Sequence, residues 1–146
     1  ARAHGILTRE LWQGALLRDV VTAALAPFSG SREKAVTMDG PRVLVRPDAA
    51  VTLSLVLHEL ATNAMKHGAL SAARGRVTLE WSSTRDLVTL CWQERGGPRV
   101  VPPTRKGFGS RLITASAQQL GGGVTLGFPP DGFEAEFRFP LDAGRA

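Results

Sequence analysis

The sequence predicts a two-layer α/β sandwich, in which a mixed, mostly antiparallel sheet carries its helices on one face. Three observations lead to this fold class. The segments follow the order helix, strand, strand, long helix, strand, strand, loop, helix, strand, strand. The last four strand segments form two hairpins, which pair antiparallel and argue against a doubly wound parallel sheet. The 146 residues, 43% of them hydrophobic, suffice for one domain with a single core.

The first half of the chain predicts two helices separated by two short strands. Apolar residues at positions 17, 20, 21, 24 and 25 repeat at helical spacing, and Pro27 is expected to end that helix. Short strands are expected near 35–38 and 43–45. The longest helix is expected to run from Pro47 to about His67, because proline suits a first helical turn and Gly68 suits a C-cap.

The second half predicts two hairpins on either side of another helix. The turn signals are residues 82–86 in the first hairpin and Pro129-Pro-Asp-Gly132 in the second. Residues 94–107 have the composition of a loop. Cys91 is the one cysteine, which excludes an internal disulfide, and its apolar surroundings predict a buried thiol. The expected strands are 76–81, 87–92, 124–128 and 133–139, and the expected helix is 109–120.

A polar stripe follows one face of the long helix. Glu59, Asn63, Lys66 and His67 share this face at helical spacing. A carboxylate can hold or deprotonate water, an amide oxygen is a hard ligand suited to Mg²⁺, and a lysine can bind phosphate. Taken alone, such a stripe is also what an ordinary solvated helix face shows. The opposing stripe is expected to face the core with Val51, Leu55, Ala61 and Met65.

Two further motifs follow the long helix. Trp92-Gln-Glu94 ends a predicted strand, and the glycines Gly96 and Gly97 behind it allow a ligand to approach the backbone closely. Gly107-Phe-Gly109 opens the next predicted helix, where free N–H groups and the helix dipole can hold phosphate. A lone Gly-x-Gly is weak support, but the three motifs in this order are much stronger.

With these motifs, the chain resembles the ATP-binding catalytic domain of sensor histidine kinases, in the GHKL ATPase superfamily. More narrowly, it resembles the HWE subfamily, which is named for a His in the first box and Trp-x-Glu in the second. His58, Trp92 and Glu94 match these positions, and the resemblance covers roughly residues 6–141. It implies a Bergerat-type fold and Mg²⁺-dependent transfer of the ATP γ-phosphoryl group to a histidine, for relay to a response-regulator aspartate.

The resemblance implies roles for the first box. Asn63 would coordinate the Mg²⁺ that bridges the ATP phosphates, and Glu59 would act as a base or polarise a group near the γ-phosphate. Lys66 and His67 would contact phosphate oxygens or the ribose side, and for His67 a solvated helix end is an equal alternative. His58 is either catalytic or structural, through packing or a hydrogen bond.

The resemblance also implies roles for the glycine boxes. Glu94 would bind the adenine amino group in place of the family's usual Asp, with Gly96 against the purine. Trp92 is expected to pack in the core or line the adenine pocket, and Arg95 to point to solvent. Residues 99–106 would be a short ATP lid, whose Arg99, Arg105 and Lys106 neutralise the triphosphate. The phosphates would be wrapped by Gly107, Phe108, Gly109 and Ser110.

The resemblance implies a piece of a longer kinase, and the first residue is not Met. Residues 1–15 are expected to be the tail of an upstream dimerisation and phosphoacceptor region, 16–141 the catalytic domain, and 142–146 a C-terminal tail. The acceptor histidine would lie upstream, since His4 stands in a loop-like segment. We therefore expect ATP binding without efficient autophosphorylation. No signal peptide or apolar span is visible, so a cytoplasmic domain is expected, in a parent that is either soluble or membrane-anchored.

Other functions remain open from the residues. A catalytically silent ATP-binding scaffold or switch of the same fold is the main alternative. An anti-sigma serine kinase or a mismatch-repair or chaperone ATPase is disfavoured by the HWE residues and the short lid. The net charge of +5 and pI near 10.6 raise nucleic-acid binding, but the chain has no tyrosine and its arginines are scattered. No nucleic-acid partner is therefore expected.

Overall fold

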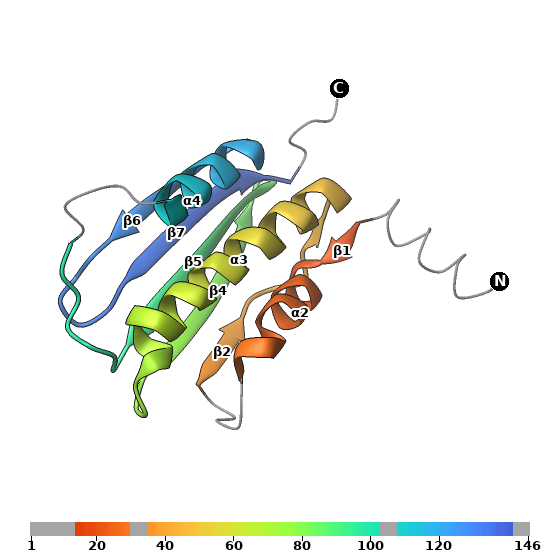
Figure 1. Cartoon of the computed structure of the whole chain (residues 1–146). Coiled ribbons are helices and arrows are strands. Elements are labelled where there is room, and N and C mark those ends of the chain that lie inside the picture. The colour runs from red at the N-terminus through yellow and green to blue at the C-terminus, as the bar shows by residue number, and fades with distance from the viewer. Residues whose placement is uncertain (1–13, 30–34, 103–107, 142–146) are drawn as a thin grey trace.

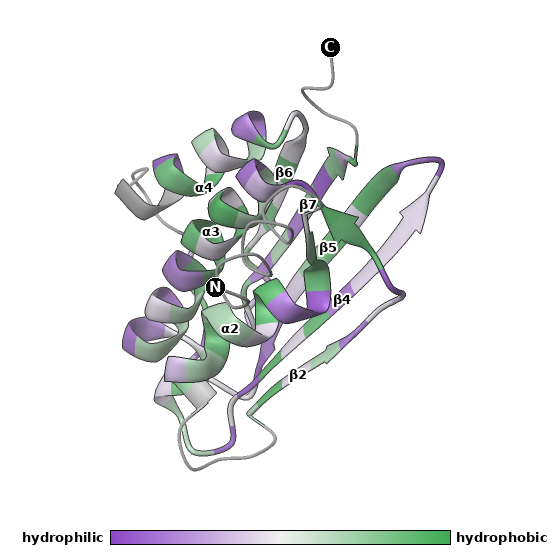
Figure 2. Cartoon of the chain, turned by 90° about the vertical axis from the view of Figure 1, so that its right-hand side faces the viewer, coloured by the Kyte–Doolittle hydropathy of each residue, from purple (hydrophilic) through white to green (hydrophobic). Residues whose placement is uncertain are grey.

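The chain forms two layers, a sheet and a set of helices on one of its faces (Figures 1 and 2). The computed structural model describes residues 14–29, 35–102 and 108–141. Helices α2 (Leu17–Ser29), α3 (Pro47–His67) and α4 (Phe108–Gln119) form the helical layer. The predicted sandwich is confirmed. The expected domain limits stay predictions, and residues 1–13 and 142–146 lie outside the described ranges.

The main sheet has five strands in the order β2-β4-β5-β7-β6. Only the β2–β4 pair is parallel, and the other three pairs are antiparallel, as expected for hairpins. A separate two-stranded sheet joins β1 (Ala15–Leu16) to β3 (Leu44–Val45). The remaining elements are β2 (Val36–Asp39), the short 3₁₀ helix η1 (Ala69–Ser71), β4 (Arg76–Thr84), β5 (Leu87–Arg95), β6 (Gly123–Gly127) and β7 (Glu134–Pro140).

Three predicted boundaries were wrong. Pro27 does not end α2, which continues to Ser29, because Phe28 packs against the core and against His58 and so holds the last turn. The first hairpin turns at Arg85 and Asp86 alone, which both have positive φ, as a tight type I′ turn requires. β5 runs to Arg95, beyond its expected end at residue 92, so Glu94 belongs to a strand and not to the following loop.

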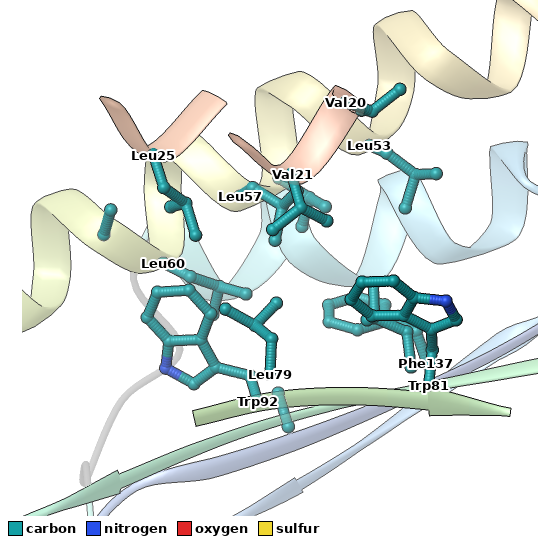
Figure 3. Close-up of a cluster of buried hydrophobic side chains, with 14 of the residues drawn as sticks. Val20, Val21, Leu25, Leu53, Leu57, Leu60, Leu79, Trp81, Trp92 and Phe137 are labelled. Carbon is teal, nitrogen blue, oxygen red and sulfur yellow. The ribbon is translucent and has the colours of Figure 1, made fainter. Parts of the chain in front are cut away.

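The core lies between the helices and the sheet (Figure 3). Alternate residues of the central strands face α2 and α3, because successive strand side chains point to opposite faces. Trp92 stands against Leu60 of α3, and Trp81 lies nearer Phe137. The other fully buried strand and helix residues include Val21, Leu25, Leu53, Val56, Leu57, Val77, Leu79, Leu90 and Phe139.

The predicted core stripe of α3 was largely wrong. Val51, Leu55 and Met65 are 63%, 56% and 47% exposed, and of the four residues only Ala61 is buried. The polar stripe does not lie opposite the buried face but along its flank, where Glu59 and Asn63 are partly buried. The face of α3 opposite the polar stripe therefore lies on the solvent side of the helix.

The prediction for Cys91 was also wrong. Leu90 and Trp92 face the core, so Cys91 points to the other face of the sheet and is only partly buried. Its Sγ lies 3.7 Å from Oε1 of Glu136. Burial and the neighbouring Glu136 raise the pKa of the thiol. Across the described residues, no helix is long and apolar enough to cross a membrane.

Candidate functional site

The polar residues of α3 fall into two groups. Glu59 and Asn63 are partly buried on the flank of the helix, and Lys66 and His67 are exposed in its last turn. His58 is exposed and faces α2, where its ring meets that of Phe28 edge-on at 5.2 Å. Asn63 lies five positions after His58 on the helix, which corresponds to about 140° around the axis. The structure therefore gives His58 a packing contact away from Asn63.

Glu94 is a buried carboxylate at the end of β5. Its residue is only 3% exposed. Oε1 accepts a hydrogen bond from the backbone N–H of Ala69 at 2.9 Å, and Oε2 accepts one from the indole N–H of Trp92 at 2.9 Å. Burial raises the pKa of this carboxyl, while the two hydrogen bonds oppose that rise because they favour the charged form. Each oxygen retains acceptor capacity for a further donor.

The end of the first motif meets the carboxylate of the second. Gly68 follows α3 with φ −117°, which is not the left-handed C-cap conformation, although its N–H still bonds to the carbonyl of Ala64. A Cβ at this position would lie 2.2 Å from Oε1 of Glu94. Glycine is therefore required here for space. The two motifs form one unit, with Gly68 and Ala69 on one side and Glu94 on the other.

The backbone after Glu94 turns sharply and is held by a charged side chain. Gly96 has φ +80°, and a Cβ on it would approach the carbonyl oxygen of Arg74 to 2.5 Å, so the turn itself requires glycine. The sequence predicted that Arg95 points to solvent, but in the structure its side chain is held by two partners. Its Nη1 donates to the carbonyl of Glu94 at 2.7 Å, and its Nη2 pairs with Glu134. Arg95 thus ties the ends of β5 and β7 together.

The third motif is described only in part. α4 begins at Phe108, and its backbone includes Gly109 and Ser110 in the first turn. The first N–H groups of a helix have no partner within it, so this end can bind an anion. Arg105, Lys106 and Gly107 lie outside the described residues. Arg99 is exposed, and the neighbouring Val100 donates its N–H to the carbonyl of Pro130 at 3.0 Å.

Two partners of the carboxylate were missed in the sequence. The Trp92 indole was expected to pack or to line a pocket, and its hydrogen bond to Glu94 was not foreseen. The signal was present, because residues two apart on a strand share a face. The Ala69 N–H gave no such signal, since it lies 25 residues away along the chain and meets Glu94 only in the fold.

Comparison with known proteins identifies similar sequences. The HWE histidine kinase family model matches residues 1–42. A blue-light-activated histidine kinase of Brucella ovis is 36% identical over 146 residues, which cover 97% of this chain and 30% of that protein. The corresponding protein of Brucella anthropi is 37% identical over 98% of this chain. The chain therefore spans about 30% of the length of these curated relatives.

Solved structures share the fold. The histidine kinase domain of the Erythrobacter litoralis EL346 blue-light-activated histidine kinase has a TM-score of 0.69 at 23% identity, covering 86% of this chain and 59% of that one. The catalytic domain of the histidine kinase ThkA has a TM-score of 0.66 at 16% identity, covering 87% and 94%. At these identities the likeness concerns the fold of the domain.

Proposed function

We propose that the chain, which is similar in sequence to HWE histidine kinases, is the ATP-binding catalytic domain of a two-component sensor histidine kinase. The reaction is transfer of the γ-phosphoryl group of ATP to a histidine. The observation that carries this proposal is the buried Glu94 carboxylate, held between the end of α3 and the end of β5 with free acceptor capacity. Such a group suits a base that offers an amino group.

The residues fit an adenine nucleotide. A buried carboxylate that only accepts hydrogen bonds recognises an exocyclic amino group and disfavours a keto oxygen at the same place. Because Gly68 has no Cβ, the carboxylate of Glu94 can approach the end of α3 without a clash. In this proposal Glu94 binds the adenine amino group, and Gly96 supports the loop beside the purine.

The phosphate side is assigned to α3 and to the start of α4. Asn63 offers an amide oxygen to the Mg²⁺ that accompanies ATP, and such oxygens suit this ion. Glu59, one helical turn earlier, polarises or deprotonates a group near the γ-phosphate. Lys66 and His67, in the last turn of α3, contact phosphate oxygens or the ribose side. The backbone of residues 107–110 cradles the phosphates, and Arg99, Arg105 and Lys106 neutralise them from the lid.

Catalysis by this domain consists mainly of positioning and charge neutralisation. Bound MgATP supplies the phosphoryl group, and phosphoryl transfer requires little covalent chemistry from the protein. The partners that we propose are upstream dimerisation helices that bear the acceptor histidine, and a response regulator that receives the phosphoryl group. We assign the domain to the cytoplasm, where ATP is available, and the parent protein is either soluble or membrane-anchored.

The second candidate is a catalytically silent domain that binds ATP only as a scaffold or switch. One observation favours it: His58 packs on Phe28, away from Asn63, and this contact is structural and not catalytic. The two candidates differ in phosphoryl transfer. A catalytic domain phosphorylates a histidine-bearing helix pair supplied in trans, whereas a silent domain binds ATP without transfer.

The first test is a calorimetric titration with ATP, with and without Mg²⁺. We expect the wild-type protein to bind more tightly with Mg²⁺, and we expect Asn63→Ala to lose that dependence. Thr62→Ala is the matched control, since Thr62 is the neighbouring residue and bonds its hydroxyl to the carbonyl of His58 in its own helix. Absence of binding by the wild-type protein at millimolar ATP would refute the proposal. Equal Mg²⁺ dependence in all three proteins would refute the role of Asn63.

A further inference from the structure

Trp92 and Glu94 form a hydrogen-bonded pair on the core side of β5. They lie two residues apart on the strand, so their side chains share a face of the sheet. The indole N–H donates to Oε2 of Glu94 at 2.9 Å, while the N–H of Ala69 donates to Oε1 at 2.9 Å. Each carboxylate oxygen therefore has one fixed donor. The two donors come from different elements, so together they fix both the position and the plane of the carboxylate.

The indole N–H of Trp92 has a task separate from that of its ring. The ring is buried and packs against Leu60 and Leu79 (Figure 3), which an ordinary apolar side chain could also do. Trp81 provides a comparison within the same core. It is also buried, but its indole N–H donates to the carbonyl of Pro41 at 2.8 Å, which carries no ionisable group.

The surroundings of Glu94 make the indole N–H important for its charge. Burial raises the pKa of Glu94, and within the described part of the chain the groups that lower it are the Ala69 N–H and the Trp92 indole. Arg76, Arg95 and Glu134 belong to the adjacent strand ends but alternate with inward-facing residues, so they lie on the opposite face of the sheet. Lys66 and His67, at the end of α3, are exposed.

We propose that Trp92 is a positioning residue for base recognition, whose indole N–H favours the charged carboxylate of Glu94 and aims it at the amino group of adenine. This inference rests on the proposed nucleotide site. The buried carboxylate must remain charged for this recognition. A protonated carboxyl would present its O–H, a donor, to the amino group of the base, which is also a donor. Trp92 thereby acts through Glu94 and does not touch the nucleotide itself.

The link between the two residues is tested first without nucleotide. Indole ¹⁵N–¹H resonances and side-chain carboxyl ¹³C resonances are followed by NMR from acid to mildly alkaline pH. In the wild-type protein, the Trp92 indole resonance is expected to move with the titration of Glu94. In Trp92→Phe, the pKa of Glu94 is expected to rise further, because one charge-favouring hydrogen bond is lost.

The matched control is Trp81→Phe, which removes an indole of the same size from the same core. It is expected to leave the pKa of Glu94 unchanged. An equal rise in both variants would overturn the proposal, as would a Trp92 indole that does not respond to Glu94. The second observation is made on the wild-type protein alone, so it decides the matter even if Trp92→Phe does not fold.

The role in recognition is then tested with ADP and inosine diphosphate, which lacks the amino group. The wild-type protein and Trp81→Phe are expected to prefer ADP. Trp92→Phe is expected to lose about tenfold of that preference at acidic pH and to regain part of it as the pH rises and Glu94 ionises. An unaltered preference in Trp92→Phe would overturn the positioning role. Failure of the wild-type protein to bind ADP would instead refute the nucleotide site, while the NMR titration still reports on the Trp92–Glu94 pair.

Discussion

Gly68→Ala tests whether the two motifs form one unit. The added Cβ would lie 2.2 Å from Oε1 of Glu94 and 3.1 Å from Cα of Ala64. The φ of −117° at Gly68 lies outside the left-handed region that favours glycine. The collision with the carboxylate is therefore the main consequence.

The magnitude follows from what Glu94 must give up. Oε1 has to retreat by roughly 1 Å to restore van der Waals contact, which breaks its hydrogen bond to the N–H of Ala69. A hydrogen bond to a charged group contributes about 1.5–3 kcal/mol, and alanine returns about 0.4–1 kcal/mol by restricting the unfolded chain. We expect Gly68→Ala to lower the free energy of unfolding by about 1–2 kcal/mol.

The assay is urea unfolding of a double-mutant cycle with Glu94→Ala. In the Glu94→Ala background the collision partner is gone, so Gly68→Ala should be neutral or slightly stabilising. Gly123→Ala is the matched control, because a Cβ there meets nothing within 4 Å, and it should not destabilise the fold. The reasoning is refuted if Gly68→Ala costs the same with and without the Glu94 carboxylate.

Three further predictions concern the core, the thiol and the buried acid. Leu57→Ala should lower the free energy of unfolding by about 2–5 kcal/mol, because Leu57 is fully buried. Leu55→Ala, on the exposed side of α3, should change it by less than about 0.5 kcal/mol. Equal losses of unfolding free energy in the two variants, measured by urea unfolding, would contradict this. Cys91 should alkylate more slowly than a free cysteine near pH 8, since burial and Glu136 raise its pKa, and iodoacetamide kinetics that match those of free cysteine would count against this. The pKa of Glu94 is raised above the 4.5 of an unperturbed glutamate, so its contribution to stability is fully present below pH 4.5 and is lost as the pH rises through the folded pKa. Glu94→Gln should therefore lose less stability than the wild-type protein from about pH 4 to pH 8. Identical pH profiles from thermal unfolding would show that the titration of Glu94 does not affect stability.

Much of the fold could be predicted from local sequence signals. The bounds of α3 followed from Pro47 at its start and Gly68 after its end, and the hairpins followed from alternating apolar residues between turn signals. These signals act over a few residues, so they can be recognised without knowing the fold. The parallel pairing of β2 with β4 is a different case, because it joins segments about 40 residues apart.

The orientation of α3 was harder to predict for a physical reason. Its polar stripe borders the buried face instead of opposing it, so polarity alone misplaced Val51, Leu55 and Met65. Cys91 was misplaced for a related reason, since an apolar run on a strand still alternates between two faces. In both elements, the neighbouring layer decides which side is buried.

The candidate site could be predicted by residue type but not by contact. Glu94 was singled out as the acid at the end of a strand, yet its buried position and its two donors depend on where the end of α3 meets β5. Gly68 caps α3 as expected, and its second role, to leave room for Glu94, appears only in the fold. Arg95 was expected to be solvated, and its partner Glu134 lies on another strand.

The most direct measurement compares ATP with inosine triphosphate, in the presence of Mg²⁺, on the wild-type protein and Glu94→Ala. Isothermal calorimetry gives both affinities, and thermal unfolding gives an independent check, since ligand at 100 times its Kd stabilises a fold by about 2.7 kcal/mol. We predict that the wild-type protein binds ATP at least about tenfold more tightly than inosine triphosphate, and that Glu94→Ala binds both equally. A wild-type protein that binds neither nucleotide, or a Glu94→Ala variant with the full preference for ATP, would contradict the assignment of Glu94 as the residue that recognises the base.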